Sequence, residues 1–226
     1  MDISGRGKSF FRSEAFQQSR PVLLTTFTNK VGSIGLGLIP ILLVEKEVSP
    51  GEGAFVLSTL KVMILLGTLV GGALSDKVSA RTTVLTALLM SAVGLGFLPF
   101  QNSIYLILLF GILAQAAEAL MNVAQRILLM AQVDASHQKE AIGWMRMVNN
   151  SAMIFSYMVG AIGARLGLMP LMLFDAASSL ASFFIGRRIL PAATPHSSPD
   201  RGLGAGNAGQ NSKLSFFGCA IVLLGW

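Results

Sequence analysis

The sequence predicts an all-α membrane protein, in which a bundle of six transmembrane helices is followed by the start of a seventh helix. Hydrophobic residues make up 53% of the 226 residues and charged residues only 12%, whereas soluble domains carry about 25% charged residues. The apolar residues also gather in runs of about 20, the length that crosses the hydrocarbon core of a bilayer. Lipid offers no partner to unpaired backbone groups, and these continuous runs lack the alternation of barrel strands, so each run is expected to be a helix.

Six spans follow from these runs, each separated from the next by a short connection. They cover residues 21–44, 54–75, 82–100, 103–125, 143–164 and 168–190.

Composition divides the chain into four parts. Residues 1–20 are polar and basic and predict a cytoplasmic tail, and residues 21–190 form the six-helix domain. Residues 191–213 are rich in Pro, Ser, Gly and Asn, which predicts a flexible cytoplasmic linker. Residues 214–226 are apolar again, but a helix of this length rises only about 20 Å. We therefore expect them to be the truncated start of a seventh helix.

The loop charges predict the orientation. The Lys and Arg residues outside the spans lie almost all in the N-terminal tail, in the second and fourth connections, and after the sixth span. Lys46 and Arg165 are the two cations on the opposite side. Because short cytoplasmic loops collect Lys and Arg, we expect a multi-pass protein of the bacterial inner membrane with its N-terminus in the cytoplasm.

Four charged residues lie inside the predicted spans and away from their ends. Lys30 lies near the middle of the first span, where a cation costs about 2.5–3.5 kcal/mol and usually faces a cavity or a partner. It is either a substrate contact or a structurally paired residue. Glu118, deep in the fourth span, is a candidate partner of Lys30 or a proton-carrying group, and Asp175 is a weaker candidate of the same kind. Lys61, in the outer half of the second span, is expected to snorkel toward the interface.

Polar side chains follow Glu118 along its predicted helix. Asn122 and Gln125 come four and seven residues later, which places them on the same helix face. Such a stripe suits a water-filled cavity, and it equally suits hydrogen bonds between helices.

The connection between the second and third spans carries a family signature. The segment 72–81 reads GALSDKVSAR and resembles the loop between helices 2 and 3 of major facilitator superfamily transporters, with Gly72, Asp76, Lys77 and Arg81 at matching positions. Ser79 stands where that pattern has a second glycine, and the usual terminal pair of basic residues is reduced to Arg81.

Further stretches are similar to the same superfamily. Residues 117–129, AEALMNVAQRILL, resemble the cytoplasmic end of helix 4 in bacterial drug and sugar exporters, and residues 29–32, NKVG, resemble a basic element of helix 1. The stretch from Ala141 to Gly163 resembles helix 5, although no proline follows Gly160 or Gly163, as it does in proton-coupled drug exporters.

The resemblance implies roles for the matching residues. Lys30, Asn29, Glu118, Asn122 and Asp175 would line a pathway for a drug-like or metabolite substrate, with proton coupling as the usual partner chemistry. The signature residues Gly72, Asp76, Lys77 and Arg81, together with Arg126, would form a cytoplasmic gate. Arg126 ends the fourth span on the side that holds Asp76, so we expect these two side chains to be in contact.

The resemblance covers one half of a facilitator, which has two six-helix halves. We therefore expect an incomplete N-terminal half whose partners are the lipid bilayer, a small-molecule substrate, and a second six-helix half or a second copy of the chain. The alternative is a non-transporting scaffold protein or an inactive fragment.

Other function classes find little support. The chain has no catalytic serine motif, no phosphate-binding loop and no metal-ligand cluster, and Cys219, His137 and His196 lie far apart. These features argue against an enzyme, a bound metal and a cofactor. The net charge of +6 resides in loops and tails rather than in a basic stripe, which argues against a nucleic-acid partner.

Overall fold

The computed structural model describes residues 13–191, apart from the side chains of Asp76 and Ala164. Every regular element in this part of the chain is a helix. The elements are α2 (Glu14–Gly32), η1 (Gly35–Leu38), α3 (Ile39–Glu45), α4 (Pro50–Lys77), α5 (Ala80–Phe97), η2 (Leu98–Phe100), α6 (Ile104–Gln132), α7 (Gln138–Gly163), η3 (Ala164–Leu166) and α8 (Leu168–Ile189). The expected linker beyond residue 191 and the expected start of a seventh helix lie outside the described residues.

Local sequence explains where several helices begin. Ser13 accepts a hydrogen bond from the backbone of Phe16 and caps α2, so the last residues of the predicted N-terminal tail are helical. Ser49 and Glu52 form a reciprocal capping box at the start of α4, with Pro50 in the first turn. Such caps satisfy amide groups that have no partner inside the helix.

Within residues 13–191, five helical segments are long and apolar enough to cross a membrane. They are Glu14–Glu45, Pro50–Ser75, Ala80–Phe100, Ile104–Gln132 and Leu168–Ile189. The predicted fifth span, residues 143–164, coincides with α7, but the polar residues of α7, among them Asn149 and Asn150, keep it outside this group. That α7 crosses the membrane therefore stays a prediction.

The first span is not the continuous helix that the sequence predicts. Helix α2 ends at Gly32, Ser33 and Ile34 leave the helical path, and the chain resumes as η1 and α3. The amide of Ser33 bonds to Lys30 rather than to Asn29, and the amide of Ile34 bonds to Gly32 at 2.6 Å. The first span is therefore two shorter helices joined at the level of Lys30.

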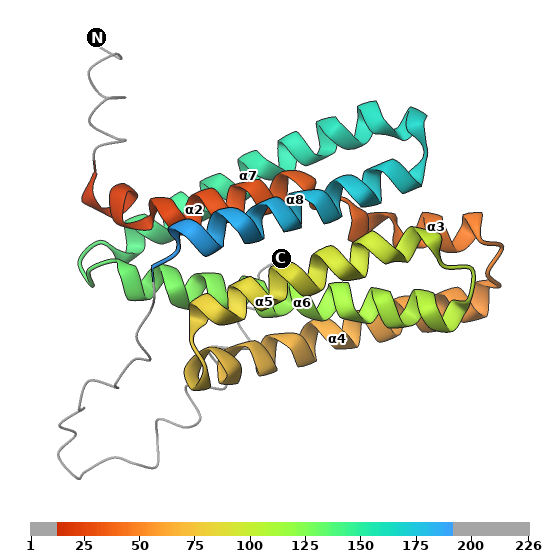
Figure 1. The fold of residues 1–226 in the computed structure, drawn as a ribbon, viewed down its shortest axis with the longest axis horizontal. Coiled ribbons are helices and arrows are strands. Elements are labelled where there is room, and N and C mark those ends of the chain that lie inside the picture. Colours follow the sequence, from red (N-terminus) through yellow and green to blue (C-terminus); the bar gives the residue numbers. More distant parts are fainter. Residues whose placement is uncertain (1–12, 192–226) are drawn as a thin grey trace. The chain divides into compact units, whose positions relative to one another are not determined.

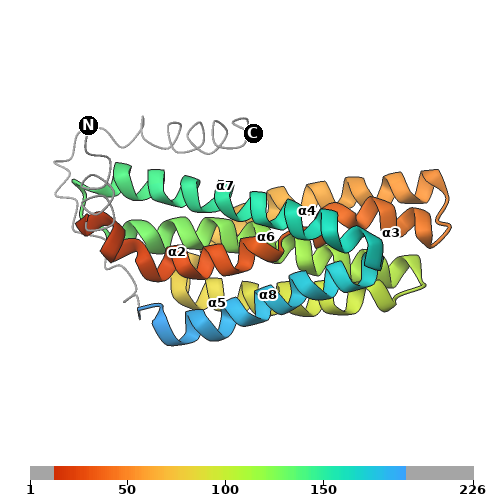
Figure 2. The same ribbon diagram turned by 90° about the horizontal axis from the view of Figure 1, so that it is seen from above.

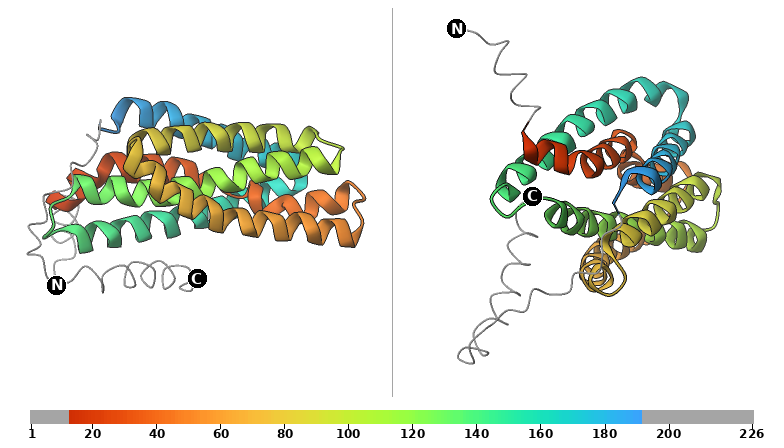
Figure 3. Two further views of the ribbon diagram at one scale, coloured as in Figure 1. Left: turned by 90° about the horizontal axis from the view of Figure 1, so that it is seen from below. Right: turned by 60° about the vertical axis from the view of Figure 1, so that its left-hand side comes forward.

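The helices pack side by side in an order that differs from their order in the chain. Helix α2 lies between α7 and α8, α8 also packs on α5, and α6 lies between α5 and α4. Figures 1 and 3 show these helices running nearly parallel along one long axis, with α4 and α7 at opposite edges. We call the end of the bundle with Glu45, Glu47 and Glu52 the acidic end, and the end with Lys77 and Arg187 the basic end.

Two large apolar cores fill the ends of the bundle, and a third, smaller cluster joins α5, α6 and α8. One core, toward the basic end, joins residues of α2, α5, α6 and α7, including the buried Leu88, Met121 and Leu128. The other, toward the acidic end, joins residues such as Leu42 and Ile107. The polar residues of the first span and of α8 lie between these two cores.

Close approach of α4 to α6 depends on glycine. A Cβ atom at Gly67 would lie 2.8 Å from the Cβ of Ala119 and 3.0 Å from the carbonyl oxygen of Ala116, whereas a Cβ at Gly72 would meet nothing within 4 Å. Small residues at such contacts let helices pack where no hydrophobic effect drives association.

We predict that Gly67→Ala lowers the free energy of unfolding by about 1–3 kcal/mol, because the backbone of α6 must shift to accept the methyl group. Unfolding by SDS titration in mixed micelles measures this change. Gly72→Ala, in the same helix, is the matched control and should leave stability unchanged or slightly raised. Equal losses for the two variants would contradict the role of Gly67 in packing.

Candidate functional site

An ion pair joins α2 to α6 in the middle of the bundle. The ammonium group of Lys30 contacts Oε1 of Glu118, and each side chain keeps 14% of its surface exposed. Lys30 lies at the midpoint of the candidate span Glu14–Glu45, and Glu118 lies at the midpoint of Ile104–Gln132. The pairing considered from the sequence is therefore present, and each charge offsets much of the cost of placing the other among apolar helices.

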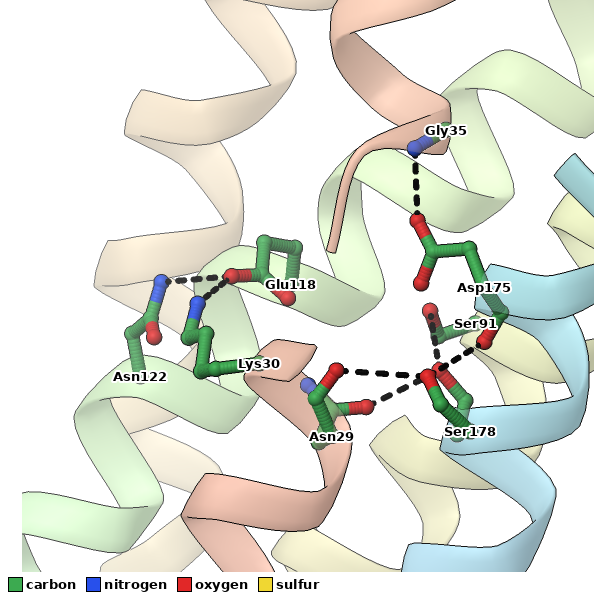
Figure 4. A network of polar contacts seen from close by, with 9 residues as sticks. Asn29, Lys30, Gly35, Ser91, Glu118, Asn122, Asp175 and Ser178 are labelled. Atoms are coloured by element: carbon green, nitrogen blue, oxygen red, sulfur yellow. Dashed lines mark hydrogen bonds and ion pairs between the residues drawn. The ribbon is translucent and has the colours of Figure 1, made fainter. Parts of the chain in front are cut away.

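The polar stripe beyond Glu118 divides into two environments. Nδ2 of Asn122 donates a hydrogen bond of 3.3 Å to the same Oε1 that contacts Lys30 (Figure 4). Gln125 is buried, and among the described residues neither of its amide atoms has a hydrogen-bond partner. Asn122 therefore bonds within its own helix and Gln125 has no partner among the described residues, so the water-filled cavity and the bonds between helices both stay predictions.

Asp175 of α8 stabilises the interruption in the first span by a hydrogen bond to its backbone. Its side chain is 4% exposed, and its Oδ2 accepts a hydrogen bond of 2.8 Å from the amide of Gly35, the first residue of η1. A buried amide at a helix start needs such an acceptor. Figure 4 shows that Asp175 bonds to Gly35 whereas Lys30 bonds to Glu118.

The next turn of α8 donates hydrogen bonds to Asn29, on the other side of the interruption. The hydroxyl of Ser178 shares its hydrogen between the carbonyl oxygen of Asp175 in its own helix, at 2.8 Å, and the carbonyl oxygen of Asn29, at 3.3 Å, which Ser33 leaves unpaired. The hydroxyl of Ser179 donates to Oδ1 of Asn29 at 2.9 Å and lies 3.4 Å from the hydroxyl of Ser91. One turn of α8 therefore provides an acceptor for one half of the first span and donors for the other.

Glycines allow this contact between α2 and α8. A Cβ at Gly32 would collide with the side chain of Ser178, and a Cβ at Gly35 would lie 2.9 Å from Oδ2 of Asp175. Sequence reasoning named Asn29 and Asp175 but missed Ser91, Ser178 and Ser179. Serine alone carries no spacing signal, and only the break in the first span shows why these hydroxyls are needed.

The signature residues gather at the basic end. Arg81 donates a hydrogen bond of 2.8 Å to the carbonyl oxygen of Arg187 and thereby ties the start of α5 to the end of α8. Gly72 lies near the end of α4, and Lys77 and Arg126 are exposed. The side chain of Asp76 lies outside what the structure describes, so its expected contact with Arg126 stays a prediction.

A groove of about 330 Å³ opens near the acidic end, between the beginnings of α4 and α6. Its lining is mainly apolar and includes Phe55 and Tyr105. It does not include the ion pair or Asp175, so the polar network is a separate feature.

Apolar helices around a paired charge at mid-depth define a multi-pass membrane protein with a polar centre. The chain matches the family model of the Major Facilitator Superfamily over residues 22–224, and it belongs to this superfamily, whose members are membrane transporters. A comparison with curated proteins gave no match.

We predict that Asp175→Ala lowers the free energy of unfolding by about 1–3 kcal/mol, because it leaves the buried amide of Gly35 without an acceptor. Asp175→Asn keeps an oxygen at the same place and should lose less. SDS titration in mixed micelles compares the two. If the Ala and Asn variants lose the same amount, the bond to Gly35 does not hold the break.

The ion pair predicts non-additive changes. Lys30→Met or Glu118→Gln alone leaves one charge without its partner and should cost about 1–3 kcal/mol, less than the about 3–5 kcal/mol of a fully buried pair. The double variant should lose much less than the sum of the two losses. A double-mutant cycle on unfolding free energies measures the coupling, and additive losses would show that the contact does not stabilise the bundle.

Proposed function

We propose that this chain forms one six-helix wall of a secondary transporter that moves a small molecule by alternating access. In this proposal α7 crosses the membrane as the fifth span, and the Lys30–Glu118 pair lines the substrate pathway. The observation that carries the proposal is the position of this pair, a cation and a carboxylate at the midpoints of two spans with both side chains still partly exposed. Charged residues at this depth usually face a bundle interior or a water-filled cavity.

The packing order supports a pathway on one face of the bundle. Helices α2 and α6, which carry the pair, lie between α7 and α4. Asn29 and Asp175 take part in the hydrogen bonds on the two sides of the break between α2 and η1. We infer that Lys30, Glu118 and Asn122 present the polar surface, and that Asn29 and Asp175 position it.

A second bundle completes the pathway in this proposal. Facilitators place the substrate between two six-helix halves that rock against each other. We propose a second six-helix half as the partner, with a second copy of this chain as the less favoured alternative.

Proton coupling would use Glu118. Its Oε1 accepts from both Lys30 and Asn122, so a proton on Glu118 would weaken both contacts and free Lys30 for another anion. We propose this exchange as the link between proton and substrate, in the manner of bacterial drug and metabolite exporters.

The basic end would be the cytoplasmic gate. Gly72, Asp76, Lys77, Arg81 and Arg126 fall at this end, and its excess of cations favours the cytoplasmic side of a bacterial inner membrane. The bond from Arg81 to the end of α8 supports a role in linking helices that move together.

Water access to the pair tests the proposal without knowledge of the substrate. In a Cys219→Ser background, we predict that Lys30→Cys and Asn122→Cys react with the membrane-impermeant cation (2-trimethylammonioethyl) methanethiosulfonate from at least one side of the membrane. Asn122→Cys leaves the ion pair intact and therefore guards against a folding defect. Labelling in right-side-out and inverted vesicles measures the rates.

Two control positions complete this experiment. Ala114→Cys lies at a buried position of α6, and Leu66→Cys lies on an exposed apolar face of α4; neither should react. If Lys30→Cys and Asn122→Cys are also unreactive from both sides, the pair is purely structural and the scaffold alternative holds.

A further inference from the structure

We propose that Lys61 of α4 is a second cation on the pathway face and that the transported molecule is a small organic anion. This inference rests on the proposed transport function and specifies its substrate class. It depends on the depth of Lys61, on the face of α4 that carries it, and on the charges around it.

The depth of Lys61 argues against the expected snorkelling. Lys61 lies within two residues of the midpoint of the candidate span Pro50–Ser75, and about 16 Å along the helix from Pro50. The hydrocarbon core extends about 15 Å on each side of its centre. A lysine side chain is much shorter than that, so Lys61 needs a wet surface nearby.

The face of α4 that carries Lys61 holds mainly polar and small residues. Ser58, Lys61, Thr68 and Gly72 recur at intervals of three, seven and four residues, which places them on one helix face with Leu65 between them. The neighbouring face carries Val62, Leu66 and Leu69, which are exposed and apolar. A helix that meets lipid on one face and a polar surface on another has this pattern.

Helix geometry places the polar face of α4 on the same side of the bundle as the ion pair. Helices α4 and α6 both run from the acidic to the basic end, and they meet through Gly67 and Gly71 on α4 and Ala119 and Leu120 on α6. Seen from the acidic end, residues of a right-handed helix advance clockwise by about 100° each. Lys61 is then about 100° clockwise from the contact with α6.

The corresponding rotation on α6 has the opposite sense. Seen from the same end, Glu118 and Asn122 lie anticlockwise from the contact of α6 with α4, by about 110–150° at 100° per residue. A clockwise displacement on one helix and an anticlockwise displacement on its neighbour bring the two polar surfaces to the same side. The axial offset is small, because the contact between Leu60 and Gly111 places Lys61 about 9 Å from the level of Glu118.

Lys61 has no counter-charge in the described part of the chain. It is exposed and makes no hydrogen bond or ion pair among residues 13–191. Glu118 is already paired with Lys30. Asp175 lies on α8, a helix that packs mainly on α2 and α5, and it is bonded to Gly35.

The pathway face therefore carries a neutral pair and one unpaired positive charge. Placing that charge at mid-depth is costly unless it faces water or an anion, and a wet pathway that carries this charge attracts anions. A lysine suits a carboxylate or a similar group as a point charge on a flexible stem. The apolar residues around the stripe suit the organic part of such a molecule.

Charge-selective labelling tests the inference. Ser58→Cys, in a Cys219→Ser background, places a thiol one turn from Lys61. The measured quantity is the labelling rate of the anionic reagent 2-sulfonatoethyl methanethiosulfonate divided by that of its trimethylammonio counterpart. We predict that, when Lys61 is present, this ratio is at least about fivefold higher than the same ratio on free cysteine. Lys61→Gln should abolish this preference and Lys61→Arg should keep it, in vesicles of pure phosphatidylcholine.

Lys46→Gln is the matched control, because Lys46 is a cation at the acidic end that bonds to Asn102. It should leave the preference unchanged. An unreactive Ser58→Cys would show that this face of α4 meets lipid. A charge preference that is the same with and without Lys61 would show that an acidic group of another bundle neutralises Lys61. Either result overturns the inference. Reactivity at Lys30→Cys and Asn122→Cys would still support the transport function, so the two proposals fail separately.

Discussion

The structure depends on one constraint, the absence of water partners inside the hydrocarbon core. A backbone polar group at that depth must be satisfied within the protein. The break between Gly32 and Gly35 would otherwise leave the carbonyl of Asn29 and the amide of Gly35 unpaired. Ser178 and Asp175 satisfy these two groups, and this bonding fixes the position of α8 against the first span. Lys30 sits in the last turn before the break, so its approach to Glu118 depends on the same bonds.

Much of the fold could be predicted from hydropathy, because the need for about 20 apolar residues per span leaves a strong signal. All six predicted segments coincide with helices, although α7 is too polar to be counted as a span by length and composition. The interruption at Ser33 was not predicted. The glycines and the proline between residues 32 and 40 permit an interruption, but the groups that stabilise it lie in α8, about 140 residues away along the chain.

The candidate site was partly predictable for the same reason. Lys30 and Glu118 are conspicuous because charges are rare in apolar runs, and a cation and a carboxylate at similar depth invite pairing. Asp175 was identified for its charge, but its bond to a backbone amide depends on tertiary structure. Lys61 was assigned to the interface because its predicted span began four residues later than α4 does. That small shift in a helix boundary moved the residue to mid-depth and changed its interpretation.

The division of the first span also bears on the order of events during synthesis. Among the described helices α8 leaves the ribosome last, so for most of translation the carbonyl of Asn29 and the amide of Gly35 lack the partners that they have in the finished bundle. An uninterrupted helix would satisfy both groups in the meantime. We therefore expect the nascent first span to stay helical through Ser33 until α8 supplies these partners.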